Sequence, residues 1–202
     1  MPTRTATKAA GRRKVPEPQL VEMGPQKVAT VTTKGDPNKM GGRVMPALYG
    51  SVYMLKSQRK KAGKDFKVGA SRARWPDSDK VSKAKWTGIW ALPVPEDTIE
   101  IPQKIPEIPV ELQTWEYGTV AQIVHIGPYS TEKKTIDKLR KFIEDKGYEI
   151  AGVHEEEYLT RPTAKVQKTL IRYQSRKRSS PGRQVSVASL LKQAMSCLAA
   201  VQ

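Results

Sequence analysis

The stretch that decides the fold covers residues 120–150 and reads VAQIVHIGPYSTEKKTIDKLRKFIEDKGYEI. The residues before Gly127, from Thr114 on, predict a strand that breaks at the Gly-Pro pair. A helix is expected from about Thr131, because apolar side chains recur there at the spacing of one helix face: Ile136, Leu139, Phe142 and Ile143. Gly147 is typical of a position just past a helix end. The stretch therefore predicts a strand, a tight turn and a helix in succession.

The first half of the chain repeats this order. A β-type run at Val28–Thr32 leads into the turn formers Gly35-Asp36-Pro37-Asn38, and Asn38 can cap a helix that runs to Gly63. In each half, two strand-like segments follow the helix. These segments are 66–75 and 86–94 in the first half, and 153–159 and 166–173 in the second. Both halves thus read strand, turn, helix, strand, strand.

Such a duplication predicts an architecture. Residues 93–109 are punctuated by prolines and read as an extended linker between two halves, about 27–95 and 112–175. Two helix-on-sheet units of this size should pair around a pseudo-two-fold axis. We therefore predict an α+β fold in which duplicated strand-helix-strand-strand units form one antiparallel sheet. The helices should lie on one face of this sheet, with a ligand cleft between the halves.

The positive charge of the chain is concentrated at its two ends. The formal net charge is +16, and ten of the 36 basic residues lie in residues 1–14 and 176–202, which contain none of the 20 acidic residues. We expect a disordered basic arm over 1–18, one domain over 19–175, and a basic tail over 176–202 whose apolar residues have helical spacing. The tails should make at most weak, nonspecific contact with polyanions.

Several classes of protein are disfavoured. Cys197 is the only cysteine and allows no internal disulfide, and no apolar run reaches the roughly twenty residues that cross a membrane. We therefore expect a cytoplasmic protein without membrane contact. Two histidines and one cysteine cannot form a zinc site of the usual kind without carboxylates, and no phosphate-binding glycine loop or nucleophile elbow occurs. We expect neither a metal nor a cofactor.

Aromatic side chains concentrate in the first half. Trp75, Trp86 and Trp90 fall on its second and third strands, and Tyr49 falls on its helix. Alternation along the third strand places Trp86, Gly88 and Trp90 on one face, where the glycine leaves a slot between two rings. A plain hydrophobic core is the alternative interpretation, because tryptophan rings bury much apolar area in small domains.

Residues 152–159, GVHEEEYL, place three consecutive acids in a strand-like run. Alternation directs His154, Glu156 and Tyr158 to one face and the other two acids to the opposite face. All three acids could be solvated residues at a sheet edge. Alternatively, a Glu156 that faces an aromatic cleft would act as the counter-ion of a cationic ligand or as a general base for water.

These motifs resemble a known family. His125-Ile126-Gly127-Pro128-Tyr129 before a helix, Gly147-Tyr148-Glu149-Ile150 after it and Glu156-Glu157-Tyr158-Leu159 are similar to the gyrase-inhibitor-like (GyrI-like) small-molecule-binding domain, also called the effector-binding domain. Arg74-Trp75-Pro76-Asp77 and the run from Trp86 to Pro93 resemble its stand-alone branch, which lacks a DNA-binding domain. The resemblance covers about residues 19–175.

The resemblance implies a site. A buried glutamate in the Glu-x-Tyr strand falls on Glu156, followed by Tyr158, while Glu157 departs from the family, where an aliphatic residue is usual. Some members of the stand-alone branch hydrolyse the strained cyclopropane of DNA-alkylating antibiotics. The ligand-binding residues expected here are Tyr49, Trp75, Trp90, His125, Glu156 and Tyr158. Glu156 and Tyr158 would be catalytic if the ligand is hydrolysed. His125 has an alternative interpretation, in which it is a core histidine packed at a turn.

Three functions remain open from the sequence. The first is binding of a planar or cationic aromatic small molecule, for sequestration or detoxification. The second is hydrolysis of cyclopropanoid compounds, in which Glu156 would activate water and Tyr158 would polarise the ligand carbonyl. The third is association with a polyanion or with gyrase through the basic tails.

Overall fold

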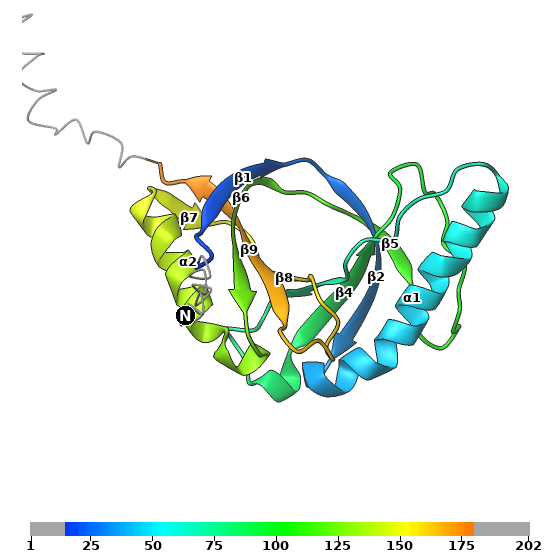
Figure 1. Ribbon diagram of the computed structural model, residues 1–202, viewed down its shortest axis with the longest axis horizontal. Coiled ribbons are helices and arrows are strands. Elements are labelled where there is room, and N and C mark those ends of the chain that lie inside the picture. The colour runs from blue at the N-terminus through cyan, green and yellow to red at the C-terminus, as the bar shows by residue number, and fades with distance from the viewer. Residues whose placement is uncertain (1–14, 180–202) are drawn as a thin grey trace, which may run out of the picture.

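A computed structural model of the chain describes residues 15–179, and Figure 1 shows its strands and helices. Most of the predicted basic arm, and the predicted helical pattern of the tail, lie outside the described residues. The strands are β1 (Gln19–Met23), β2 (Gln26–Lys34), β3 (Arg72–Trp75), β4 (Thr87–Pro93), β5 (Glu111–Trp115), β6 (Gly118–Ile126), β7 (Tyr148–Ile150), β8 (His154–Tyr158) and β9 (Lys168–Lys177). The helices are α1 (Pro37–Lys61) and α2 (Lys133–Asp145), with single 3₁₀ turns at Lys83–Lys85 and Tyr129–Thr131.

The nine strands of the described residues join in the order β1-β6-β9-β8-β3-β4-β2-β5, and β7 pairs with the end of β9. Every pairing is antiparallel. The two repeats meet at β3 and β8, in the middle of the sheet. β1 pairs with β6 and β5 pairs with β2, so the short strand that precedes each strand-helix-strand-strand unit joins the other unit. The predicted α+β fold, with two repeats sharing one antiparallel sheet, is confirmed.

The helices lie at opposite ends of the curved sheet (Figure 1), and α1 packs against β2 and β4 whereas α2 packs against β6 and β7. Three clusters of buried side chains result. One lies between α1 and the first repeat and includes Leu48 and Leu92, and a second lies under α2 and includes Leu139 and Ile171. The third, which includes Trp115, covers the opposite face of the sheet. The helices therefore cover the two ends of one face, and the third cluster lies on the other face.

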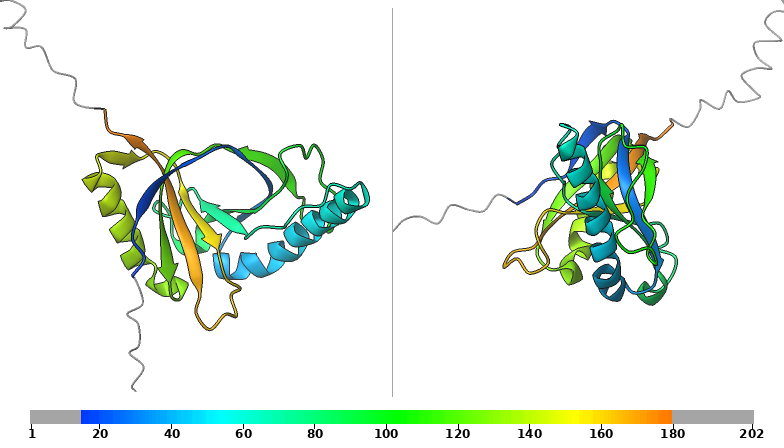
Figure 2. Two further views of the ribbon diagram at one scale, coloured as in Figure 1. Left: turned by 45° about the horizontal axis from the view of Figure 1, so that its top comes forward. Right: turned by 90° about the vertical axis from the view of Figure 1, so that its right-hand side faces the viewer.

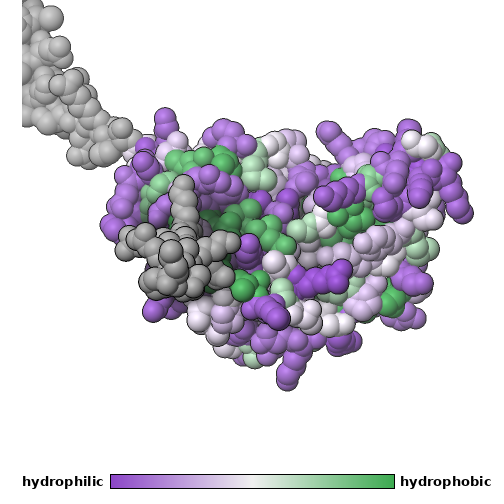
Figure 3. All heavy atoms as spheres, in the orientation of Figure 1, coloured by the Kyte–Doolittle hydropathy of each residue, from purple (hydrophilic) through white to green (hydrophobic). Residues whose placement is uncertain are grey.

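Helix α1 begins where the turn formers predict, but its cap is a different residue. The Asp36 carboxylate accepts a hydrogen bond from the backbone N–H of Asn38 at 3.0 Å, so the prediction that Asn38 is the cap is wrong. Val44, Leu48, Val52 and Leu55 recur at helical spacing, and all four are buried against the sheet. The last turn carries Arg59, Lys60 and Lys61, where cations favour a helix end, and Figure 3 shows hydrophilic side chains crowded over this end.

The second repeat turns at Gly127, whose φ of 144° suits glycine and few other residues. One 3₁₀ turn then leads into α2, which buries Leu139 and Ile143 from the predicted stripe. Glu132 precedes the helix at its N-cap, but its side chain makes no capping hydrogen bond. That carboxyl is therefore free to face elsewhere.

Strand boundaries differ from the sequence pattern in three places. The predicted strand over 66–75 is shorter, because only Arg72–Trp75 lies between two partner strands. The predicted strand over 114–126 divides into β5 and β6 at Gly118, whose φ is 69°. Strands β1 and β7 were not predicted, since each is short and depends on a distant partner.

The proline-rich linker has no helix or strand between Pro93 and Glu111, as the sequence predicts. It is nonetheless packed against the first repeat. Ile101 and Val110 are buried, and the Lys104 backbone N–H donates to the Ser51 hydroxyl of α1 at 3.0 Å. The linker therefore helps to cover α1 as well as joining the repeats.

Candidate functional site

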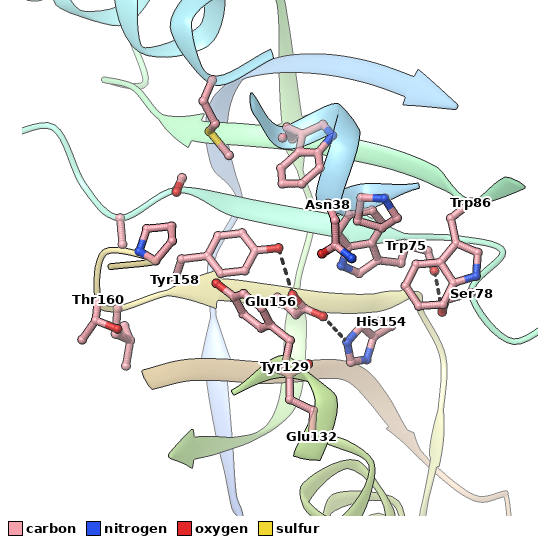
Figure 4. A pocket seen from close by; sticks show the side chains of 18 of the residues that line it. Asn38, Trp75, Ser78, Trp86, Tyr129, Glu132, His154, Glu156, Tyr158 and Thr160 are labelled. Carbon is pink, nitrogen blue, oxygen red and sulfur yellow. Dashed lines mark hydrogen bonds and ion pairs between the residues drawn. The ribbon is translucent and has the colours of Figure 1, made fainter. Parts of the chain in front are cut away.

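A cavity of about 1200 Å³ opens on the face of the sheet that carries both helices. Its walls come from α1, α2, β3, β4, β8, β9 and the loops beside them, so both repeats contribute. Figure 4 shows it from close by. The volume is slightly above the usual range for drug-sized ligands, roughly 300–1000 Å³. The predicted cleft between the halves is therefore present and large.

Tryptophan rings from the first repeat form one wall. Trp75 fills the slot predicted at Gly88, because a side-chain carbon on Gly88 would stand 2.8 Å from the Trp75 ring. The Trp75 ring centroid lies 5.1 Å from that of Trp90 and 5.6 Å from that of Trp86. Trp75 and Trp90 are buried members of the core and also line the cavity. The two interpretations of these tryptophans, core and site, describe the same rings.

Tyrosines extend the aromatic surface into the second repeat. The Tyr158 ring stacks near Trp90 with centroids 6.5 Å apart, and the Tyr129 ring meets Tyr158 edge-on at 5.9 Å. Tyr49 lines the cavity from α1. Burial first, and the negative charge of Glu156 second, raise the pKa of Tyr158 well above its usual range. The Tyr158 hydroxyl therefore stays a hydrogen-bond donor.

Glu156 lies at the centre of the cavity floor, between the two repeats (Figure 4). Its side chain is buried, with 7% of the residue exposed. Tyr158 donates to Oε2 at 2.9 Å, and His154 Nε2 lies 3.1 Å from Oε1. Across the sheet Glu156 pairs with Ala73 of β3. Among residues 15–179, no lysine or arginine forms an ion pair with Glu156.

The two flanking glutamates have the opposite environment. Glu155 and Glu157 lie on the other face of β8 and bind three arginines there, with the pairs Arg74–Glu155 at 2.8 Å, Arg172–Glu155 at 3.3 Å, Arg172–Glu157 at 2.6 Å and Arg72–Glu157 at 3.2 Å. We call this group the back-face network. The interpretation of all three acids as solvated edge residues is wrong, because β8 lies in the middle of the sheet and all three side chains are largely buried.

Glu132 is a cavity residue that the sequence did not indicate. It is 7% exposed, lines the cavity from the start of α2, and its Oε1 has no hydrogen-bond partner in the described part of the chain. Burial first, and then the charge of Glu156, raise the pKa of its carboxyl to about 8, against smaller opposing effects of the Thr169 hydroxyl and Lys83. Near neutral pH the cavity therefore holds one protonated carboxyl close to Glu156.

Five of the six expected ligand-binding residues line the cavity: Tyr49, Trp75, Trp90, Glu156 and Tyr158. His125 does not. Its ring is buried beside the Gly127 turn, where Nδ1 lies 2.8 Å from the Thr135 hydroxyl and Nε2 lies 3.2 Å from the Pro128 carbonyl oxygen. The structure thus places His125 in the position of a core histidine that holds a turn to α2.

One loop borders the cavity without entering the sheet. The loop between β8 and β9 protrudes from the body of the protein in both views of Figure 2, and Thr160, Arg161 and Pro162 line the cavity from it.

Within residues 15–179, no three His, Cys, Asp or Glu side chains lie close enough together to hold a metal ion. In the same part of the chain, no helix combines the length and apolar character needed to cross a membrane.

Comparisons with known proteins agree with this architecture. An uncharacterised conserved protein from Listeria innocua has 23% sequence identity and a TM-score of 0.70, covering 79% of this chain and 92% of its own. A hydrolase from Listeria innocua has 22% identity and a TM-score of 0.67, covering 82% and 94%. The C-terminal domain of EcmrR has 14% identity and a TM-score of 0.58, covering 82% and 100%. At these identities the likeness shows the fold alone.

None of the curated proteins matches the sequence. The family model of the GyrI-like small molecule binding domain matches residues 16–174, which include both repeats and every side chain of the cavity named above. The resemblance seen in the sequence motifs is thereby confirmed. The chain belongs to the family of GyrI-like small molecule binding domains.

Proposed function

We propose that the protein binds a planar or cationic aromatic small molecule in the cavity between its two repeats, for sequestration or detoxification. The observation that carries this proposal is the pairing of a buried carboxylate, Glu156, with aromatic rings from both repeats. Within residues 15–179 this carboxylate is held by His154 and Tyr158 and has no lysine or arginine partner, so it has lost much of its hydration without gaining a permanent cation. A ligand cation would supply that partner.

The aromatic walls suit a flat ligand. Rings offer large contact areas at little cost in side-chain entropy, and they attract cations through their electron-rich faces. Trp90 and Tyr158 come from different repeats, and their rings lie within 29° of parallel. A planar ligand lying along them would contact both repeats and approach Glu156 at the same time.

The test uses a planar cationic dye and the full chain. Tryptophan fluorescence should be quenched on binding, and mass spectrometry should recover the dye unchanged. Glu156→Gln keeps the shape of the side chain but removes its charge, so affinity for the cation should fall by about tenfold or more. Quenching by a neutral dye of the same shape should change little. Equal affinity of the unmodified chain and the Glu156→Gln variant for the cationic dye would contradict the proposal.

A second candidate function is hydrolysis of a cyclopropane conjugated to a carbonyl group. The observation that favours it is the protonated Glu132 near the Glu156 carboxylate, which gives the cavity an acid and a base. Water would attack a ring carbon while Glu156 takes its proton and the carbon–carbon bond breaks. The electron pair of that bond would move onto the carbonyl oxygen, which Tyr158 would polarise and Glu132 would protonate. The fold is shared with a hydrolase from Listeria innocua.

Hydrolysis is tested with a cyclopropane-bearing electrophile in water labelled with ¹⁸O. Turnover should place one labelled oxygen in the product. Glu156→Gln and Glu132→Gln should each abolish product formation while the Gln variants still bind a neutral planar dye. Recovery of the electrophile unchanged would reject the hydrolase and leave the binding proposal standing.

A further inference from the structure

A chain of hydrogen bonds leads from the cavity wall to the far side of Glu156. Arg140 of α2 lies 3.3 Å from the Tyr173 hydroxyl of β9, and that hydroxyl lies 2.8 Å from Nδ1 of His154. The other ring nitrogen of His154, Nε2, lies 3.1 Å from Oε1 of Glu156. Three side chains from α2, β9 and β8 therefore stand in line behind the carboxylate.

The donors and acceptors in this series of hydrogen bonds allow only one direction in which every side chain has a matching partner. A guanidinium can only donate, so the Tyr173 oxygen accepts from Arg140. The Tyr173 proton then points to Nδ1 of His154, which must accept it. Nε2 therefore carries the ring proton and donates it to Glu156, as a carboxylate requires.

The other two states of His154 fit less well. A proton on Nδ1 alone would turn the Nε2 lone pair toward a carboxylate oxygen at 3.1 Å, which is repulsive. A proton on both nitrogens would leave the Tyr173 proton without an acceptor, since its hydroxyl has no other partner among residues 15–179. It would also bring a second cation to a buried hydroxyl that Arg140 already contacts.

We propose that Arg140 and Tyr173 fix His154 as the Nε2–H tautomer, and that His154 is thereby the positioning residue of Glu156. This inference rests on the proposed function, because it concerns how the ligand-binding carboxylate is held. His154 holds Oε1 from one side and Tyr158 holds Oε2 from the other. The plane of the carboxylate is thus fixed before a ligand arrives, which reduces the ordering cost of binding.

The consequence is a link between two parts of the cavity wall. Arg140 and Tyr173 line the cavity, as do His154 and Glu156. The Tyr173 ring also meets the His154 ring at 5.3 Å and the Arg140 guanidinium at 5.5 Å, so packing and hydrogen bonds hold the same side chains. Removing the Tyr173 hydroxyl, in the middle of this series of hydrogen bonds, should loosen the Glu156 carboxylate, which that hydroxyl does not contact.

The tautomer can be observed directly in the protein without ligand. The chain has two histidines, so ¹⁵N labelling of histidine gives two rings, and His125 serves as an internal reference. Near neutral pH the ring of His154 should show a protonated Nε2 and an unprotonated Nδ1. A protonated Nδ1, alone or together with Nε2, would overturn the inference and leave the proposed function untouched.

The positioning role is tested with Tyr173→Phe, which removes the hydroxyl and keeps the ring. Tyr148→Phe is the matched control, because Tyr148 packs under α2 in the same repeat and does not line the cavity. Tyr173→Phe should lose the single tautomer of His154 and bind the planar cationic dye about three- to tenfold more weakly, the size of one hydrogen bond. Tyr148→Phe should keep both properties.

Two further outcomes separate the inference from the proposed function. If Tyr173→Phe loses the tautomer but binds the dye as tightly as the unmodified chain, His154 does not position Glu156 and the inference fails. If the unmodified chain shows the expected tautomer but binds no planar cation, the proposed function fails, while the hydrogen-bond direction assigned to His154 is supported.

Discussion

The two faces of β8 use the same kind of side chain for different purposes. On the back face, Glu155 and Glu157 are neutralised by three arginines. On the cavity face, Glu156 has a histidine and a tyrosine as partners and, within residues 15–179, no arginine or lysine. A buried carboxylate with matched cations is a structural element, whereas one held only by neutral donors keeps the capacity to bind a cation. The partners, more than the burial, distinguish the site.

The back-face network also explains how the cavity face is assembled. Arg72 stands opposite Glu157 and Arg74 stands opposite Glu155 across the seam between β3 and β8, so that Ala73 falls opposite Glu156. Strand β8 has little hydrophobic pattern to set its register, and matched charges are a known means of setting one. A shift by one residue would exchange the two faces and remove Glu156 from the cavity.

The largest effect should come from breaking the back-face network. Glu155→Leu leaves Arg74, Arg172 and the hydroxyl of Tyr117 without their common acceptor. Loss of one partner from a buried ion pair costs about 3–5 kcal/mol, so chemical denaturation should show a fall of that size in the free energy of unfolding. The control is Glu149→Leu, whose partner Arg176 is exposed, and its cost should stay below about 1 kcal/mol. Similar stabilities of the two variants would contradict the assignment of the network.

A smaller effect is expected on the pH dependence of ligand binding, because Glu132 on the cavity face is protonated near neutral pH. Glu132 has a pKa of about 8 in the free protein, raised by burial and by Glu156. A bound cation favours the ionised form of Glu132, so binding below pH 8 should release the proton of this carboxyl. Affinity for the cation should therefore rise with pH, by up to about tenfold per unit, and level off above the pKa. Calorimetry in buffers of different ionisation enthalpy measures the released proton.

The raised pKa of Glu132 makes stability change with pH in the opposite direction to affinity. Between the ordinary carboxyl pKa and about 8, the folded protein holds the Glu132 proton and the unfolded chain does not, so this contribution makes stability fall as pH rises. Glu132→Gln should flatten both the stability profile and the affinity profile over that window. An affinity that stays independent of pH in the unmodified chain would rule out Glu132 as a proton donor to the site.

The smallest effect is expected at the edge of the aromatic surface. Tyr129 is 36% exposed, lines the cavity and contacts the Tyr158 ring edge-on. Tyr129→Ala should weaken binding of the planar dye by about two- to tenfold, the range of one aromatic contact, with little change in stability. Tyr148→Ala serves as a binding control. Unchanged affinity in Tyr129→Ala would show that the ligand does not contact the Tyr129 ring.

The fold and much of the cavity floor follow from local patterns. Strand alternation alone separates Glu156 from its neighbours, and helical spacing finds the buried faces of α1 and α2. Short strands such as β1 leave little signal, because their stability comes from a partner about a hundred residues away. The sequence also contains two signals for the pairing of β3 with β8. Arg72-x-Arg74 and Glu155-x-Glu157 are complementary at a spacing of two, as facing strands require.

Glu132 and His125 show where local patterns fail. An acid before a helix ordinarily interacts with the helix dipole or with water, and nothing in the sequence around Glu132 indicates a side chain turned to the cavity. His125 sits in a motif of the family, but its ring reaches Thr135 of α2 and not the cavity. In both cases the direction of the side chain depends on how α2 packs on the sheet, which is a tertiary property.

The most direct test of this account uses the four tryptophans of the chain. Trp75, Trp86 and Trp90 line the cavity, whereas Trp115 lies on the back face, 3.8 Å from the centre of the Arg74 guanidinium. With ¹⁵N-labelled indole groups, titration of a planar cationic dye should shift the N–H signals of the three cavity tryptophans and leave Trp115 unchanged. Shifts at Trp115 alone, or at none of the four while the dye binds, would contradict a ligand site on the cavity face of β8.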